Sequence, residues 1–250
     1  SIDNIIEVET GENSVFAIKN DGSLWSWGYN TSGQLGISSS QNSSIPTKVG
    51  LKGVQQLSAS QSHALALLKN GIVMSWGNNL FDALGTNTEV KKETTPVEVQ
   101  GLSDVKKVIA GAHYSLAVKN DGSVWSWGFN EFGMLGQGHN EPTRLAAPIA
   151  GLNNIIDVVS GQSHVVALSE SGKVYTWGLN NYAQLGNGTY TNSNIPVELP
   201  LENIVMIATG EHHSLAVNNV GELYAWGFNN MGQLGDGTIN NRSTATQISL

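Results

Sequence analysis

The sequence predicts an all-β fold, a β-propeller in which five blades of four strands each follow one another along the chain. Three observations predict it. The dipeptide Trp-Gly recurs five times at intervals of 49 to 51 residues, the same side chains stand at fixed distances around each copy, and no segment has a helical period. We expect a single domain over residues 1–250, with repeats at about 1–50, 51–100, 101–150, 151–200 and 201–250.

Each repeat carries the same markers. An Asn stands three residues after each Trp of the Trp-Gly pairs, a Leu-Gly pair begins eight residues after it, and a Gly lies five residues before it. A single blade cannot bury both of its faces, so we interpret the repeated Trp and Leu as packing between neighbouring blades. The tryptophans of this structural repeat are Trp27, Trp76, Trp127, Trp177 and Trp226.

The first three strands of a repeat follow from local patterns. In repeat 1, Ile5–Thr10 is rich in β-branched residues and predicts a strand, and Ser14–Lys19 predicts a second one. Residues 20–22 (Asn-Asp-Gly) indicate a hairpin, because glycine adopts a positive φ without steric cost. Ser23–Trp27 alternates small and large side chains and predicts the third strand.

A polar loop and a short fourth strand complete the repeat. Residues 38–44 are polar, and we expect Pro46 to open a strand at Thr47–Val49. Proline suits an edge strand because it lacks the N–H that a sheet ladder needs. In the last repeat the corresponding strand is expected at Thr246–Leu250.

Composition excludes several classes of function. The net charge of −8, with no Lys/Arg run longer than a pair, opposes binding to nucleic acids. The absence of cysteine excludes disulfides, thiolate metal sites and cysteine nucleophiles. No apolar run approaches the roughly 18–20 residues that span a bilayer. We therefore expect neither a nucleic acid nor a membrane as partner.

The last repeat shows a family pattern most clearly. Residues 210–217 read Gly-Glu-His-His-Ser-Leu-Ala-Val, Gly221 follows, residues 226–229 read Trp-Gly-Phe-Asn, and residues 232–235 read Gly-Gln-Leu-Gly. This pattern resembles the regulator of chromosome condensation repeat, and the resemblance extends through all five repeats over essentially the whole chain. It implies a propeller of that family's type, usually a ring of seven blades. This sequence shows five.

The repeat number bears on the end faces of the blade stack. We expect Trp25 and Trp27 on one end face, and Trp226 and Leu234 on the other. Apolar patches of that size usually mark an interface. A closed five-blade ring, self-association or a longer natural chain would each cover them. Because the resemblance implies blades set at the angle of a seven-fold ring, we favour self-association that completes the ring, or a longer chain.

Three histidines share one column of the repeat: His63, His164 and His213. Imidazoles at one end of a propeller channel could bind a metal. The column is also a feature of the family that the repeat resembles, so we interpret these histidines as part of the structural repeat and expect no metal and no cofactor. No spaced carboxylate pair or nucleophile motif is present either, and we predict no catalytic residues.

Aromatic residues in the loops are the candidate binding residues. Tyr29, Phe129 and Phe228 follow Trp-Gly directly, and Phe132 and Tyr182 lie slightly further along the same loops. Aromatic side chains on divergent loops of a rigid scaffold are typical binding anchors. Packing at the blade edge is the alternative.

The function that we predict is therefore that of a protein-binding propeller module that is not an enzyme. Members of the family that the repeat resembles differ in activity: the founding protein exchanges nucleotide on a nuclear GTPase, a plant relative senses ultraviolet-B light, and a bacterial relative inhibits β-lactamases. The alternatives are thus an exchange factor for a small GTPase or an inhibitor of a secreted enzyme. Polar Ser/Asn/Thr loops and few lysines favour an extracellular or cell-surface bacterial protein.

Overall fold

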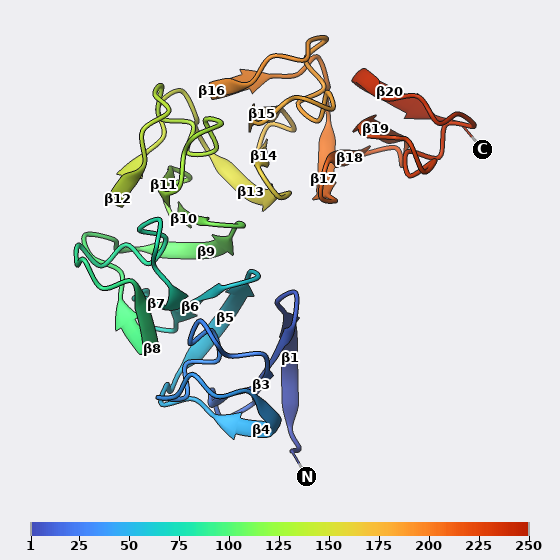
Figure 1. Cartoon of the computed structure of the whole chain (residues 1–250). Coiled ribbons are helices and arrows are strands. Elements are labelled where there is room, and N and C mark those ends of the chain that lie inside the picture. Colours follow the sequence, from blue (N-terminus) through green and yellow to red (C-terminus); the bar gives the residue numbers. More distant parts are fainter. Residues whose placement is uncertain (1, 250) are drawn as a thin grey trace. The chain divides into compact units, whose positions relative to one another are not determined.

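The computed structural model describes residues 2–249, and all of their regular secondary structure is β-strand. Over that range the chain forms five antiparallel sheets of four strands, one for each repeat (Figure 1). The predicted all-β architecture of five four-stranded blades is confirmed. The described residues contain no helix long and apolar enough to cross a membrane.

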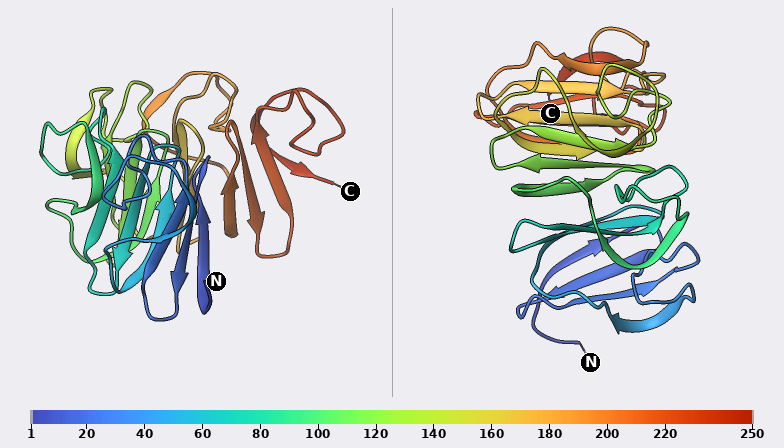
Figure 2. Two further views of the ribbon diagram at one scale, coloured as in Figure 1. Left: turned by 60° about the horizontal axis from the view of Figure 1, so that its bottom comes forward. Right: turned by 90° about the vertical axis from the view of Figure 1, so that its left-hand side faces the viewer.

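The four strands of each blade lie side by side in sequence order (Figures 1 and 2). Blade 1 comprises β1 (Ile5–Thr10), β2 (Ser14–Lys19), β3 (Leu24–Gly28) and β4 (Ser43–Lys48), and blade 2 comprises β5 (Val54–Ala59), β6 (His63–Leu68), β7 (Val73–Asn78) and β8 (Lys92–Glu98). Blade 3 comprises β9 (Val105–Ala110), β10 (Tyr114–Lys119), β11 (Val124–Gly128) and β12 (Thr143–Pro148). Blade 4 comprises β13 (Ile155–Ser160), β14 (His164–Ser169), β15 (Val174–Gly178) and β16 (Ser193–Glu198), and blade 5 comprises β17 (Ile204–Thr209), β18 (His213–Asn218), β19 (Leu223–Gly227) and β20 (Arg242–Ile248).

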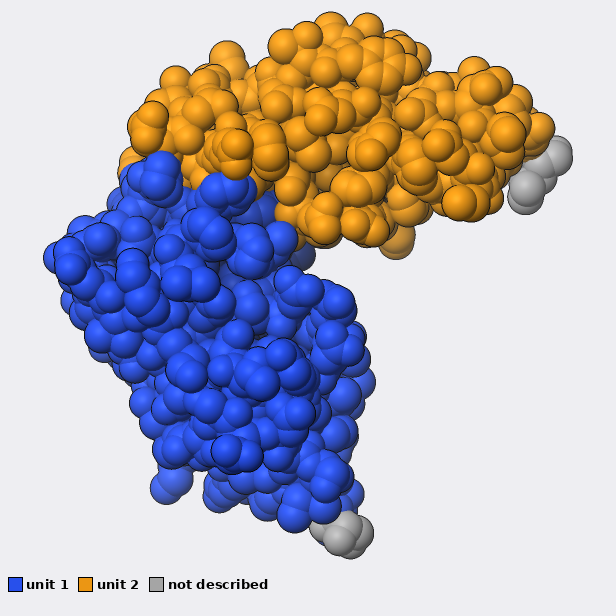
Figure 3. Space-filling view, in the orientation of Figure 1, with its two compact units in different colours: residues 1–120, 125–129, 142–147 blue, residues 121–124, 130–141, 148–250 orange. Residues whose placement is uncertain are grey.

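The chain divides into two compact units (Figure 3). Unit 1 holds blades 1 and 2 and most of the strand residues of blade 3, and unit 2 holds blades 4 and 5 together with loops of blade 3. The expectation of a single domain over residues 1–250 stays a prediction. Unit 1 is Ser1–Asn120, Trp125–Phe129 and Pro142–Ala147, and unit 2 is Asp121–Val124, Asn130–Glu141 and Pro148–Leu250.

The fourth strands differ from the sequence prediction. β4 begins at Ser43, before Pro46, and not at Pro46 itself. The pairing of β3 with β4 jumps from Ser26↔Thr47 to Gly28↔Ser43, so Pro46 lies in the irregular stretch of an edge strand and needs no ladder hydrogen bond there. β20 likewise starts earlier than predicted. Leu250, the last residue of the predicted strand, lies outside the described residues.

Apolar side chains hold neighbouring blades together. We call the side of a blade toward the next repeat its front face and the other side its back face. In unit 1, Leu65 and Leu67 on the front face of blade 2 are buried in one cluster with Val105, Val108 and Trp127 of blade 3. In unit 2, Val166 and Leu168 of blade 4 are buried with Ile204, Ile207 and Trp226 of blade 5 in the same way.

The repeated tryptophans explain the repeated Leu-Gly pairs. The indole Nε1 of Trp177 donates to the carbonyl of Met134, and that of Trp226 to the carbonyl of Gln184, at 2.8 and 2.9 Å. A Cβ at Gly186 would lie 2.6 Å from the Trp226 ring, so the close approach requires glycine. Trp76 and Trp127 make the same bond with Gln34 and Ala83.

The prediction for the C-terminal end face was therefore wrong. Trp226 and Leu234 are only 0% and 2% exposed, because Trp226 lies on the back face of blade 5, against blade 4. On blade 1, Trp25 and Trp27 are both only partly buried, and Trp27 is the one tryptophan of the five Trp-Gly pairs that is not fully buried.

Candidate functional site

The Trp-Gly pair sets the position of the residue that follows it. Gly128 has a φ of 104°, and a Cβ there would lie 2.8 Å from the carbonyl oxygen of His113. The next N–H, of Phe129, donates to that same carbonyl at 3.0 Å. Phe129 is thereby placed beside His113. The same geometry in blade 5 places Phe228 beside His212, with a hydrogen bond of 2.9 Å.

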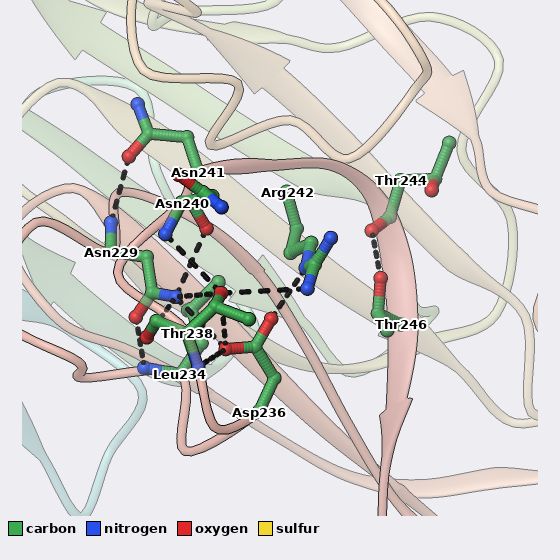
Figure 4. Close-up of polar contacts among 9 residues, drawn as sticks. All are labelled: Asn229, Leu234, Asp236, Thr238, Asn240, Asn241, Arg242, Thr244 and Thr246. Carbon is green, nitrogen blue, oxygen red and sulfur yellow. Dashed lines mark hydrogen bonds and ion pairs between the residues drawn. The ribbon is translucent and has the colours of Figure 1, made fainter.

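A buried asparagine fixes the loop that follows. In blade 5, the side-chain Nδ2 of Asn229 donates to the carbonyls of Thr238 and Asn240, and its Oδ1 accepts from the backbone N–H of Leu234 (Figure 4). Asn229 is 0% exposed. The loops on this rim of the blades are thus built on satisfied polar groups, which gives them fixed positions.

The blade 5 loop has a further brace. The carboxylate of Asp236 pairs with Arg242 and accepts hydrogen bonds from the N–H and hydroxyl of Thr238 (Figure 4). Burial alone would raise the pKa of Asp236, but these hydrogen bonds and the ion pair outweigh it and lower the pKa to about 2. Asp236 is therefore a charged structural group.

The first candidate site lies within unit 1, and we call it trio 1: Phe81, His113 and Phe129. The Phe81 ring centroid is 5.0 Å from that of His113 and 4.9 Å from that of Phe129. Phe81 comes from the loop after β7 of blade 2, and its two partners come from blade 3. Phe81 remains 40% exposed. Burial lowers the pKa of His113, so its imidazole is neutral at physiological pH and packs as an aromatic ring.

Unit 2 contains a second site of the same form, trio 2: Tyr182, His212 and Phe228. The Tyr182 ring centroid lies 4.9 Å from each of the other two rings. The His212 and Phe228 rings meet edge to face at 6.2 Å, against 6.4 Å for the corresponding pair in trio 1. Tyr182 is 38% exposed. Two copies of one aromatic arrangement therefore occur at equivalent positions of the repeat.

The corresponding positions between blades 1 and 2 are polar. The positions of the repeat that hold Phe81, His113 and Phe129 in trio 1 are here occupied by Ser32, Ser62 and Asn78. These polar side chains and Tyr29 line a cavity of about 360 Å³. Asn78 nonetheless keeps the backbone hydrogen bond to the Ser62 carbonyl. The loop conformation therefore does not require aromatic side chains, and the trios are additions to the scaffold.

Three of the five candidate binding residues lie in the trios. Phe129 lies in trio 1, and Tyr182 and Phe228 lie together in trio 2. Tyr29 is 43% exposed at the polar cavity, and Phe132 is half-buried and belongs to neither trio. Their role in binding stays a prediction.

Sequence reasoning missed Phe81, His113 and His212 as members of a site. A signal was available. Phe81 stands five residues after Trp76, at the same position of the repeat as Phe132 and Tyr182. His113 and His212 each supply the backbone carbonyl that accepts a hydrogen bond from the N–H of the residue after Trp-Gly.

The histidine column is buried between blades. His63 is 0% exposed; its Nδ1 lies 2.9 Å from the Ser60 hydroxyl and its Nε2 lies 3.0 Å from the Ser115 hydroxyl of the next blade. His164 meets Ser214 of blade 5 in the same way, at 2.9 Å. Burial lowers the pKa of both histidines to about 3, so both rings are neutral at physiological pH. His213 is only partly buried.

Metal binding has no evident place in this arrangement. Among residues 2–249, no three or more His, Asp or Glu side chains gather where they could hold a metal ion. Our expectation that the protein uses no metal and no cofactor stays a prediction.

Family models match the chain along most of its length. Two models described as "Regulator of chromosome condensation (RCC1) repeat" each match five times. One matches residues 21–67, 70–118, 121–168, 171–217 and 220–249, and the other matches residues 5–34, 54–82, 105–133, 155–184 and 204–233.

Curated relatives are similar over about half of the chain. Protein pim1 of Schizosaccharomyces pombe is 36% identical over 162 residues, which cover 56% of this chain and 30% of pim1. The human E3 ubiquitin-protein ligase HERC2 is 34% identical over 147 residues, or 56% of this chain and 3% of HERC2. The ultraviolet-B receptor UVR8 of Arabidopsis thaliana is 32% identical over 140 residues, or 54% of this chain and 32% of UVR8. The chain thus spans about a third or less of these relatives.

Solved structures share the fold. The crystal structure of human WBSCR16 matches with a TM-score of 0.85 at 23% identity, over 98% of this chain and 67% of that one. Yeast RCC1 (Prp20), in a crystal structure with Kap60 bound, matches with a TM-score of 0.76 at 22% identity, over 98% of this chain and 75% of that one. These likenesses show that the blades are those of a β-propeller.

Proposed function

The chain belongs to the regulator of chromosome condensation (RCC1) repeat family, and we propose that it is a protein-binding module whose anchors are trio 1 and trio 2. The observation that carries this proposal is the duplicated aromatic arrangement. In each trio, an aromatic ring about two-fifths exposed lies within about 5 Å of a histidine and a phenylalanine.

The chemistry of the trios suits protein recognition. Aromatic side chains carry much of the binding energy at protein interfaces, and they do so when rigid neighbours hold them in place. Here the Trp-Gly hydrogen bonds and the buried asparagines fix the loops before any partner arrives. Serine and asparagine replace the aromatics between blades 1 and 2, which supports a role outside blade packing.

Paired variants test this proposal. Each trio loses its anchors in Phe81→Ala with Phe129→Ala, or in Tyr182→Ala with Phe228→Ala. Tyr190→Ala is the matched control, because Tyr190 is 55% exposed and belongs to neither trio. We expect a partner captured by the unmodified protein and by the control to lose affinity by at least about 30-fold in a trio variant, the effect of about 2 kcal/mol. Equal capture by all four proteins would refute the assignment.

Nucleotide exchange on a small GTPase is the alternative function, and it follows from the family's founding activity. It also requires a protein partner but produces a different readout. If exchange is the activity, the protein accelerates the release of labelled nucleotide from a GTPase of the panel tested, and the trio variants slow that release. Inhibition of a secreted enzyme is the third alternative, which an assay against secreted hydrolases tests in the same way.

A second copy of the chain is a further partner that we propose.

A further inference from the structure

The polar cavity between blades 1 and 2 lies where a trio would place its rings. Two serines and an asparagine stand at those positions, Ser32, Ser62 and Asn78, and their side chains are shorter than the rings of trio 1. A space of about 360 Å³ remains, near the lower end of the roughly 300–1,000 Å³ of ligand sites. Every residue that lines it belongs to unit 1. The cavity therefore has the size of a site for a small ligand.

Ser62 supplies the cavity with a buried hydroxyl that has no partner. Its side chain is 8% exposed, and its Oγ makes no hydrogen bond within residues 2–249. The loop does not need this hydroxyl, because the backbone carbonyl of Ser62 accepts the N–H of Asn78 at 2.8 Å. Leaving a buried hydroxyl without a hydrogen bond is unfavourable, so this group indicates a molecule that enters the cavity and completes the bond.

The neighbouring amides are fixed in place. The side-chain Oε1 of Gln34 accepts the N–H of Ser32 at 3.0 Å, and its Nε2 donates to the carbonyl of Gln61 at 3.1 Å, which ties the loops of blades 1 and 2 together. The Oδ1 of Asn78 accepts the N–H of Leu80 at 2.8 Å, so the orientation of that amide is set. Preorganised polar groups of this kind lower the cost of ordering a site when a ligand binds.

The residue types indicate an uncharged ligand with several hydroxyl groups. Among the described residues that line the cavity, none is an Asp, Glu, Lys or Arg, and burial lowers the pKa of His113, so its imidazole is neutral at physiological pH. A charged ligand would therefore lose its hydration without gaining a counter-ion. Amide and hydroxyl side chains both donate and accept, as sugar hydroxyls do. The ring of Tyr29 offers an apolar surface to the C–H face of a sugar.

We propose that this cavity binds a saccharide unit, with the Ser62 hydroxyl as its buried hydrogen-bonding group and the amides of Gln61 and Asn78 beside it. This inference goes beyond the proposed function and does not depend on a protein partner. The cavity lies next to trio 1, because His113 belongs to both.

Nuclear magnetic resonance titration of the isotope-labelled whole chain tests the proposal. The probes are D-glucose, D-galactose, D-mannose and N-acetyl-D-glucosamine. We expect at least one of them to cause saturable shifts of the backbone amide signals of Gln61, Ser62 and Asn78. The methyl glycoside of that sugar then separates two sources: binding of both forms indicates a unit of a glycan, and binding of the unmodified sugar alone indicates a free sugar.

Two results of the titration would overturn the proposal. One is the absence of saturable shifts at these amides with all four sugars. The other is a response to acetamide and to none of the sugars, which would assign the cavity to an amide side chain of a protein partner.

Ser62→Ala separates ligand binding from a structural role. Because the Oγ of Ser62 has no partner in the empty cavity, the variant should keep or raise the Tm of the unmodified protein in the absence of sugar. Its affinity for the bound sugar should fall by about 5-fold or more. Ser163→Ala is the matched control, because Ser163 occupies the same repeat position in blade 4 and does not line the cavity. The control should bind the sugar as the unmodified protein does.

A second variant closes the cavity with rings that the repeat already accepts. Ser32→Phe with Asn78→Phe introduces the residues that stand at the same positions as Phe81 and Phe129, so the variant should fold and lose the sugar-induced shifts. Full sugar affinity in this variant or in Ser62→Ala would contradict the assignment. Ser62→Ala leaves all residues of both trios in place, so its result is independent of the capture of a protein partner.

Discussion

Substituting phenylalanine for the repeated tryptophans should have unequal effects, and Trp177→Phe should cost more than Trp226→Phe or Trp27→Phe. Trp177 is 0% exposed, and its indole donates to the Met134 carbonyl at 2.8 Å. No other donor within residues 2–249 reaches that carbonyl. Phenylalanine would leave the acceptor buried without a partner and leave a gap where the larger indole was.

The magnitude follows from these two losses. A buried acceptor without a partner costs about 1–3 kcal/mol. The lost ring volume costs roughly another 1–2 kcal/mol, a fraction of the cost of Trp→Ala in a core. The free energy of unfolding should fall by about 2–5 kcal/mol, which lowers Tm by roughly 5–15 °C in a chain of this size.

Two other tryptophans serve as internal comparisons. Trp226→Phe should cost about 1 kcal/mol less, because the Gln184 carbonyl still accepts a hydrogen bond from the Ser214 hydroxyl at 3.1 Å. Trp27→Phe should cost less than about 1 kcal/mol, because Trp27 is only partly buried and its indole N–H has no acceptor within residues 2–249.

Urea unfolding followed by circular dichroism measures these differences without depending on tryptophan fluorescence. Equal destabilisation by Trp27→Phe and Trp177→Phe would refute the reasoning, since it would mean that the indole hydrogen bond and burial do not hold the blades together.

Three further outcomes follow from the titratable groups. Burial holds the pKa of His63 and His164 at about 3, below the ordinary 6.5, so the unfolded chain binds protons at a higher pH than the folded chain does. The free energy of unfolding should therefore fall as the pH is lowered from about 6.5 toward 3. In urea titrations, His63→Asn should reduce that pH dependence by up to about 1.4 kcal/mol per pH unit. The lowered pKa of Asp236 stabilises the folded chain above the ordinary value of 3.8, and this stabilisation is lost as the pH falls toward 2. At pH 6, Asp236→Asn should therefore unfold at a lower urea concentration than the unmodified protein. On acidification to pH 2.5, the variant should lose less unfolding free energy than the unmodified protein does. Dialysis against a chelator should leave Tm unchanged, and a drop of several degrees that zinc reverses would contradict the structural interpretation of the histidine column.

Much of the fold could be predicted because five copies of one pattern report on it. The spacing of Trp27, Trp76 and their equivalents gives the blades, and the hairpin glycines give the boundaries between strands. That spacing does not show on which face of a blade each tryptophan lies. Trp226 was therefore assigned to the wrong side, although it lies against blade 4.

The trios were only partly predictable for a related reason. Phe129 and Phe228 could be recognised as candidates because they follow Trp-Gly. Each trio, however, joins columns of two successive repeats, as when Phe81 of blade 2 meets His113 of blade 3. The carbonyl hydrogen bond behind Gly128, which places Phe129 beside His113, depends on the backbone geometry of the folded blade. The sequence pattern of a single repeat therefore does not predict the contact between Phe129 and His113.

Site-specific photocrosslinking tests most directly the claim that the trios are the binding anchors. A photoreactive phenylalanine analogue would replace Tyr182 in trio 2, and in a control protein it would replace Tyr190, which is 55% exposed in the same unit. We predict a discrete protein adduct from position 182 that is absent from position 190 and disappears when Phe228→Ala is added. No adduct at position 182, or the same adducts from both positions, would contradict the claim.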